Sequence, residues 1–190
     1  MCALRPDAGV EPGVLLVASP MLGDPNFDRS VVFIAEHSED GAMGLVLNRP
    51  SEAQVAEVIP DLDWVADAGA EVVYVGGPVA PNGVIVLAEW EDPSQAVVLV
   101  DDDLGFVPGD TEDTEALAAA LRRARVYAGH AGWGPGQLED ELGEDAWIVE
   151  SPLREELFSD DAAGLWSAVL RRKGREFALL ATMPPDPSLN

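Results

Sequence analysis

Short apolar runs recur along the first half of this chain, separated by Gly, Pro, Asp or Asn. Most are four or five residues long and rich in valine, which is typical of strands. Because most are apolar at successive positions, both faces of the sheet must be covered, by helices or by closure into a barrel. The predicted strands are 14–18, 31–35, 45–47, 72–75, 84–88 and 97–100, with a last one at 177–181.

A different periodicity predicts four helices, each with an apolar face at helical spacing. The first begins at a capping box of Ser51 and Gln54 and ends at Pro60. The second has acidic residues at its start and three arginines at its end, an order that complements the helix dipole. The predicted helices are 51–59, 112–125, a short one between Pro135 and Gly143, and 161–172.

Strands come first, in hairpins, and helices cluster later, so the sequence predicts an α+β fold with a mixed, mostly antiparallel sheet. The polar segment between Ala35 and Met43 is expected to be a hairpin loop, with Gly41 at positive φ. No fixed-period repeat or Ser/Gly-rich linker divides the chain. We therefore expect a flexible leader at 1–12, one domain at 13–183 and a loose tail at 184–190.

The charge is the unusual part of the composition: 35 acidic residues face 11 basic ones, for a net charge of -24. Because nucleic-acid affinity depends on Lys and Arg neutralising phosphates, this balance argues against direct nucleic-acid binding. The single cysteine, Cys2, cannot form an internal disulfide, which points to a reducing cytoplasm. Neither a signal peptide nor a membrane-spanning run is expected.

Two polar turns are candidates for binding. In the first, Asp24 and Arg29 lie between two predicted strands, either as an anion or carboxylate clamp or as an ion pair that pins the turn. In the second, Asn48 and Arg49 end a strand just before a predicted helix, where polar groups can form the mouth of a ligand site. Gly44 in that strand indicates close approach of another backbone or of a ligand.

The segment from Gly129 to Leu142 places one aromatic residue, Trp133, among glycines ahead of a short acidic helix. Trp133 either fills the core at a tight corner or forms an exposed aromatic platform. Gln137 lies in the first helical turn and Glu141 one turn later, on roughly the same face. Trp147 is expected to pack in the core.

Evidence for chemistry is sparse. His37, beside Glu36, could serve as an acid–base group or as a hairpin residue bonding a nearby carbonyl. No nucleophile has an evident base, and no ligand spacing predicts a metal or cofactor. Gly76-Gly77-Pro78 lacks the spacing of a nucleotide fingerprint and is interpreted as a structural turn.

Four blocks in order resemble the bacterial YqgE/AlgH family: residues 20–31, 36–50, 76–78 and 129–147. The resemblance implies a compact α+β fold with a small closed barrel and flanking helices, in a bacterial cytoplasmic protein. Members are described as regulators of transcription, and no catalytic residue set is implied. The sequence shows no helix-turn-helix signature, so any regulation is expected to be indirect, through a protein or small ligand.

The leading hypothesis is a noncatalytic binding or regulatory module for an unknown protein or small molecule, because binding groups usually lie at turns and strand ends. An alternative is a small-molecule enzyme with His37 as acid–base group. A third is direct nucleic-acid binding through Arg171-Arg175, a cluster that a helix C-terminus also explains. The sequence assigns no oligomeric state. The proposed binding residues are Asp24, Arg29, His37, Asn48, Arg49, Trp133 and Gln137.

Overall fold

The computed structural model describes residues 10–109 and 113–183 of the chain, which form a sheet of ten strands. Each valine-rich run predicted in the first half of the chain overlaps a strand, so those six predictions are confirmed. The strands are β1 (Leu15–Ala18), β2 (Val31–Ser38), β3 (Gly41–Val46), β4 (Pro50–Gln54), β5 (Val72–Val75), β6 (Val79–Trp90), β7 (Val98–Asp101), β8 (Leu104–Phe106), β9 (Leu121–Trp133) and β10 (Trp147–Glu150).

The sheet is open, so the predicted closed barrel is wrong. Its strand order is β10-β1-β2-β3-β9-β6-β8-β7, and β4 and β5 branch off because β5 also pairs with β9. Closure would require the two terminal strands, β10 and β7, to pair with each other, and they do not. The mostly antiparallel sheet is as predicted, since only the β5–β9 pairing is parallel among the described pairs.

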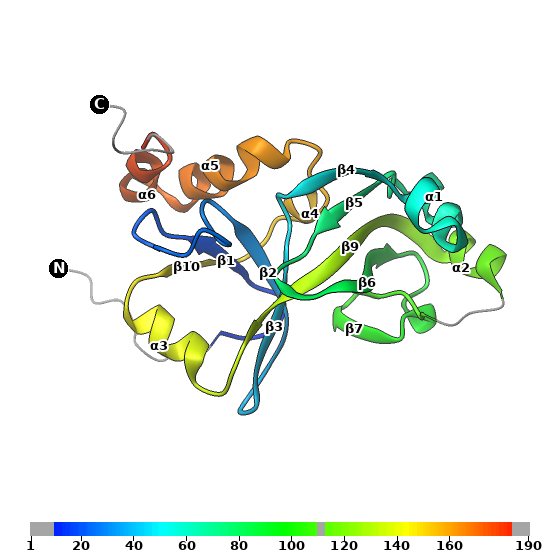
Figure 1. The fold of residues 1–190 in the computed structure, drawn as a ribbon, viewed down its shortest axis with the longest axis horizontal. Coiled ribbons are helices and arrows are strands. Elements are labelled where there is room, and N and C mark those ends of the chain that lie inside the picture. The colour runs from blue at the N-terminus through cyan, green and yellow to red at the C-terminus, as the bar shows by residue number, and fades with distance from the viewer. Residues whose placement is uncertain (1–9, 110–112, 184–190) are drawn as a thin grey trace.

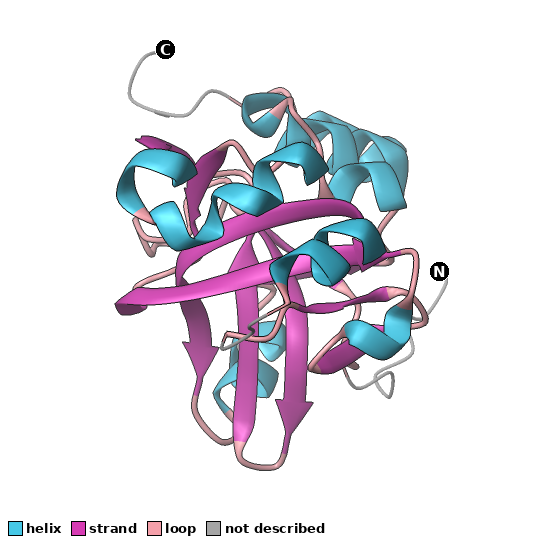
Figure 2. Cartoon of the chain, turned by 90° about the vertical axis from the view of Figure 1, so that its right-hand side faces the viewer, coloured by secondary structure: helices cyan, strands magenta, loops and turns pink. Residues whose placement is uncertain are grey.

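Strand β9 joins the two halves of the sheet. Its last residues pair with β3, while its earlier residues lie between β5 and β6 (Figure 1). The strands of the two halves run in different directions (Figure 2), and one face of each half contributes to a shared core. The apolar runs are thus covered by the opposite half-sheet and by helices, which explains why they do not alternate.

Helices are more numerous than the four predicted, and they are short. Those within the described residues are α1 (Val55–Val58), the 3-10 helices η1 (Pro60–Ala68) and η2 (Pro93–Gln95), α2 (Thr114–Ala120), α3 (Gln137–Gly143), α4 (Arg154–Leu157), α5 (Ala162–Lys173) and α6 (Arg175–Leu180). The predictions for α3 and α5 are confirmed. Asp161 caps α5 by accepting a hydrogen bond from the Gly164 N–H at 2.9 Å.

Three segment predictions are wrong. The capping box at Ser51 does not form: β4 occupies these residues, and the Ser51 hydroxyl donates to the Val73 carbonyl at 2.7 Å. The second helix ends at Ala120, because pairing with β6 takes Leu121 onward into β9. The last predicted strand is helix α6, which packs beside α5.

Helices cover three apolar clusters. The central cluster lies between the two half-sheets and contains side chains of α5 such as Trp166. Helices α1, η1 and α2 cover the outer face of the β5–β9–β6 half, where Trp90 is buried. Helix α3 covers the outer face of the β1–β2–β3 half, through Leu138. This arrangement leaves the polar strand ends and turns at the rims.

Two chain segments cross closely next to β5. A Cβ atom on Gly77 would overlap the backbone of His130, and one on Gly76 would overlap the carbonyl of Gly129. Gly77 and Gly129 also have positive φ, at 153° and 69°. The Gly76-Gly77-Pro78 segment therefore has a packing role, in agreement with its interpretation as a structural turn.

Candidate functional site

Asn48, in the turn after β3, contacts the start of β2 and the turn before it through its side-chain amide. Its Oδ1 accepts from the Val31 N–H at 2.9 Å, and its Nδ2 donates to the Arg29 carbonyl at 2.9 Å. Arg29 has φ 51°, an unusual value for a non-glycine residue, and this bridge holds it there. The amide offered by the sequence as a ligand contact therefore orders the turn before β2.

The two arginines and the aspartate of this region do not form one clamp. The predicted Asp24–Arg29 ion pair is not formed: Asp24 accepts from the Asn26 N–H at 2.8 Å, and the Arg29 guanidinium lies 4.7 Å from the centroid of the Trp166 ring. The guanidinium of Arg29 also donates to the Met183 carbonyl. Arg49 donates to the Asp28 carbonyl at 3.3 Å.

Trp133 is a core residue, only 5% exposed, so the exposed-platform alternative is wrong. Its indole N–H donates to Glu141 Oε2 at 3.0 Å, and Trp147 donates to the same oxygen at 2.7 Å. Phe27 stacks on Trp133, with ring centroids 6.1 Å apart. Gln137 donates to the other Glu141 oxygen at 2.8 Å, which confirms that these two side chains share a helix face.

His37 links β2 to α3. Its Nε2 lies 2.8 Å from Glu139 Oε1, and its Nδ1 contacts the carbonyl of Val10, a buried residue. Both ring nitrogens are therefore engaged within the fold. A role as acid–base group stays a prediction.

Of the seven residues predicted from the sequence, the structure brings together Arg29 with Asn48, and Trp133 with Gln137 through Glu141. The contacts of Asp24, Arg49 and His37 are separate from these and from one another. None of the seven lines the cleft over β6 described below or the smaller cavity beside α4 and α5. Their contacts hold turns and helices against the sheet, so these residues of the family blocks have packing roles.

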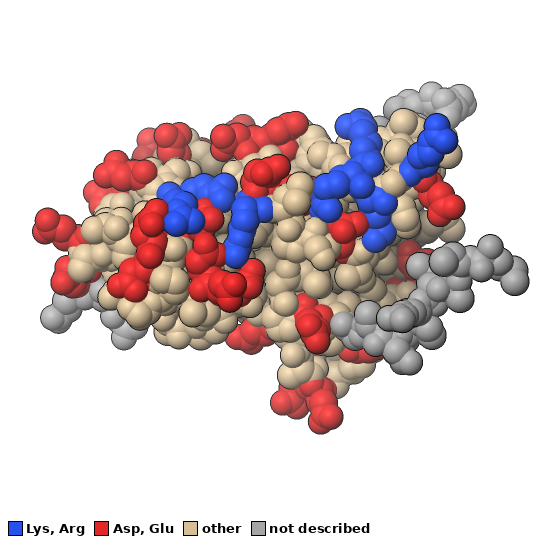
Figure 3. All heavy atoms as spheres, turned by 180° about the vertical axis from the view of Figure 1, so that it is seen from behind, with Lys and Arg blue, Asp and Glu red and all other residues tan. Residues whose placement is uncertain are grey.

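Two of the three basic residues in the last turn of α5 are paired with carboxylates. Arg172 pairs with Glu156 at 2.9 Å and with Glu150 at 3.4 Å, and Lys173 pairs with Glu150 at 3.3 Å. Figure 3 shows basic side chains in two groups interspersed with acidic ones on one face of the molecule. Such a surface offers little uncompensated positive charge to a phosphate backbone.

A second ion-pair network lies on β6 and β9. Glu89, 4% exposed, accepts from Arg123 at 2.6 Å and from Arg122 at 3.3 Å. Burial alone would raise the pKa of Glu89, but the hydrogen bonds and charges of Arg123 and Arg122 outweigh it and hold that pKa below its usual range. The sequence predicts both arginines at the end of a helix, and that prediction gives no reason to expect them to pair with Glu89.

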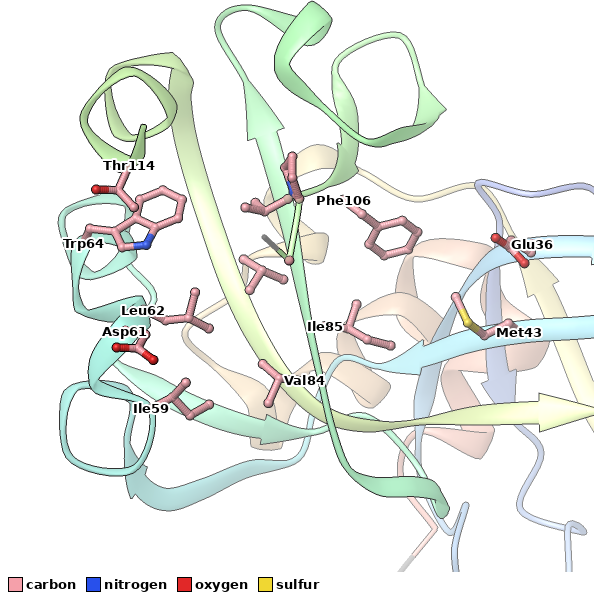
Figure 4. Close-up of a pocket in the computed structure, with 14 residues that line it drawn as sticks. Glu36, Met43, Ile59, Asp61, Leu62, Trp64, Val84, Ile85, Phe106 and Thr114 are labelled. Carbon is pink, nitrogen blue, oxygen red and sulfur yellow. The ribbon is translucent and has the colours of Figure 1, made fainter. Parts of the chain in front are cut away.

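An open cleft of about 800 Å³ lies over β6 (Figure 4), within the size range of ligand sites. Ile59, Leu62 and Trp64 of the α1–η1 segment line one side of it. Met43 and Phe106, from β3 and β8, line the other side, on which Ile85 of β6 also lies. These residues come from distant parts of the chain, so no local motif could have indicated the cleft.

The cleft carries negative charge only. Glu36 and Asp61 line it and lie on opposite sides of β6 in Figure 4, and none of the described lining residues is Lys, Arg or His. A cavity that presents both apolar surface and carboxylates suits a ligand that has an apolar body and positive charge.

Neither a metal centre nor a membrane span is found within residues 10–109 and 113–183. No group of three or more His, Cys, Asp and Glu side chains there is arranged to hold a metal ion. Of the helices in this part of the chain, none has the length and apolarity needed to cross a bilayer.

The AlgH-like family profile (DUF179) matches residues 15–178, nearly all of the described fold. The chain belongs to the AlgH-like family. This confirms the resemblance carried by the four sequence blocks.

Relatives of this AlgH-like chain match it along almost its whole length. A UPF0301 protein of Streptomyces avermitilis is 43% identical over 94% of both chains. One from Mycobacterium tuberculosis is 42% identical, over 95% of this chain and 91% of the relative. These proteins are uncharacterised, so the family supports a fold and a lineage rather than an activity.

Two solved structures share the fold. A crystal structure of a Corynebacterium diphtheriae protein superposes with a TM-score of 0.83, at 30% identity, over 92% of this chain and 93% of that protein. The solution structure of the AlgH protein from Pseudomonas aeruginosa gives a TM-score of 0.70, at 32% identity, over 97% of this chain and 98% of that protein. The α+β architecture is therefore common to the family.

Proposed function

We propose that this AlgH-like protein is a noncatalytic binding or regulatory module whose ligand occupies the cleft over β6. The cleft itself supports this function, because it is open, about 800 Å³ in volume and lined by both apolar and polar groups. Val84 lies within it and is 45% exposed, although its neighbours on β6 from Val86 onward are buried.

The ligand has an apolar part and a cationic part. The apolar part contacts Leu62, Trp64 and Val84, where burial of apolar surface provides the free energy of binding. The cationic part is attracted by Glu36 and Asp61 and by the net charge of -24. This charge also steers anionic partners such as nucleic acids away from the cleft.

Regulation, in this proposal, is indirect: the protein binds a partner and does not contact DNA itself. The acidic composition supports this, as does the pairing of Arg172 and Lys173 with carboxylates. We place the protein in the bacterial cytoplasm, which its bacterial relatives and its single cysteine support.

The test uses a neutral apolar dye, Nile red, whose fluorescence rises in apolar sites. Dye binding is compared between the wild type and Val84→Asp, which places a charge in the cleft. Val98→Asp on β7 is the matched control, because Val98 is 46% exposed and lies outside the cleft. We expect Val84→Asp to bind the dye at least about tenfold more weakly, because the new charge removes one region of apolar contact with the dye. Equal binding in Val84→Asp and the wild type would contradict the assignment of the cleft.

A further inference from the structure

One edge of β6 stops being paired where it enters the cleft. Strand β8 pairs with Leu87, Ala88 and Glu89 of β6, and the Val107 N–H adds one more bond, to the Val86 carbonyl at 3.0 Å. Strand β8 ends at Phe106, and Pro108 and Gly109, which line the cleft, are not part of a strand. Residues of β6 before Val86 therefore have no strand on this side within the described residues.

Val84 presents its backbone to that open side. In an antiparallel ladder both backbone groups of a residue point to one side, and the direction alternates along the strand. Since the Val86 carbonyl faces β8, the N–H and C=O of Val84 face the same side, away from β9. Among the described residues, none donates to or accepts from the Val84 backbone there.

Apolar surfaces flank this edge above and below the plane of the strand. Leu62 and Trp64 lie on one side, and Met43 and Phe106 lie on the other (Figure 4). An added strand sends successive side chains to opposite faces, so it fills both surfaces at once. A compact small molecule would fill one surface and leave the Val84 backbone unused.

We propose that the cleft binds an extended peptide, which adds to the open edge of β6 at Val84 and continues the line of β8. The inference rests on the proposed function and names its ligand class. The backbone of the peptide exchanges hydrogen bonds with Val84, and its apolar side chains enter the two flanking surfaces. Basic residues flank the apolar ones, because Glu36 and Asp61 line the cleft and the whole chain is acidic.

The edge strand β7 is the competing location. It ends the sheet, and Val98 and Leu99 on it are each 46% exposed. Neither residue lines the cleft over β6, so a peptide at β7 would not place its side chains in that cleft. The test therefore includes a variant at each edge.

The probe is a capped synthetic octapeptide, Lys-Arg-Val-Ile-Val-Val-Arg-Lys, with binding measured by calorimetry at physiological salt. A second peptide has the same sequence and charge but carries N-methyl groups on its alternate central residues, in two versions that cover both registers. Loss of binding in one N-methyl version reports backbone hydrogen bonding rather than charge attraction. We expect that version to bind at least about tenfold more weakly than the parent, as for the loss of one hydrogen bond or more.

The matched protein variants are Val84→Pro and Val84→Ala. Proline removes the N–H that faces the cleft, and this N–H does not bond β9, so the ladder stays complete. Alanine shortens the side chain and keeps the N–H. We expect peptide affinity to fall about tenfold or more in Val84→Pro relative to Val84→Ala.

The outcomes separate this inference from the proposed function. Three results would each overturn strand addition. The first is equal affinity for the parent and all N-methyl peptides, and the second is no peptide binding at all. The third is peptide binding that is lost in Val98→Asp but kept in Val84→Pro. If Nile red still binds in these cases, the cleft remains the ligand site. If neither dye nor peptide binds, both proposals fail. If Val84→Pro unfolds, strand addition is tested with the N-methyl peptides and with hydrogen exchange in the wild type. The exchange rate of the Val84 amide should fall on peptide binding.

Discussion

The indole N–H of Trp133, at the end of β9, donates to Oε2 of Glu141 on α3 at 3.0 Å. This bond lets a large aromatic residue between glycines lie in the core with its polar atom satisfied. The same carboxylate oxygen accepts from Trp147 at 2.7 Å. One side chain thus orders the junction of β9, α3 and β10.

Removing this carboxylate should destabilise the fold. Glu141→Ala leaves the indole N–H groups of two buried tryptophans without an acceptor, and we expect a loss of about 2–4 kcal/mol in the free energy of unfolding. Urea unfolding followed by tryptophan fluorescence measures it. Glu144→Ala, at the exposed end of the same helix, is the control and should change stability by less than about 0.5 kcal/mol. Similar values for the two variants would contradict the structural role of Glu141.

Asn48 and Arg49 are adjacent in sequence, but their substitution should have different effects. Asn48→Asp keeps the acceptor for Val31 and places a carboxylate oxygen against the Arg29 carbonyl, where the amide now donates. We expect a cost of about 1–3 kcal/mol. Arg49→Ala removes one long, solvent-exposed bond of 3.3 Å and should cost less than about 0.5 kcal/mol. Thermal and urea unfolding of both variants check this, and the reverse ranking would refute it.

The ion pairs of Glu89 predict a pH dependence of stability. Because the pKa of Glu89 is lowered in the folded state, its contribution is present above the unfolded-state pKa and is lost as pH falls through the folded-state pKa. Glu89→Gln should therefore be less stable than the wild type by roughly 1–3 kcal/mol at neutral pH. The difference should shrink below about pH 4.

Urea titrations of both proteins at several pH values measure this difference. Glu91→Gln serves as the control, since Glu91 is exposed and binds the same Arg122 from the surface. A difference between wild type and Glu89→Gln that grows on acidification would show that the sign is wrong.

The close crossing of two chain segments next to β5 leaves no room for a side chain at Gly77. Gly77→Ala combines a φ of 153° with an overlap between the new Cβ atom and the His130 backbone. We expect a loss of roughly 2–4 kcal/mol in the free energy of unfolding. Gly143→Ala is the matched control, because no atom lies within 4 Å of its added Cβ and its φ is not positive. Equal effects in thermal unfolding would argue against the crossing.

The strands of this fold could be predicted better than its helices. Burial on both faces gives valine-rich runs such as 31–35, and these are visible without knowledge of the partner strands. The helical spacing of Leu117, Leu121 and Ala124 was misleading, because Leu121 and Ala124 pair with β6. Tertiary pairing overrides local propensity in such segments. Closure into a barrel depends on whether β7 and β10 meet, which no local pattern encodes.

The candidate site could not be predicted from the sequence, whereas several packing contacts could. The faces of α3 and the core position of Trp147 follow from spacing and size. The cleft requires residues as distant as Glu36 and Phe106 to approach each other, and its open edge depends on where β8 stops. Of its lining residues, Glu36 and Met43 fell inside a family block, and nothing there distinguished them from packing residues.

Strand β9 is synthesised late, although three other strands pair with it. It pairs with β3, β5 and β6, and it begins only at Leu121, after those three strands have been synthesised. During translation the earlier strands therefore emerge with their apolar residues exposed and their central partner missing. Because such long-range pairing is slow and leaves strand edges open, the nascent chain is most prone to aggregation just before this strand leaves the ribosome.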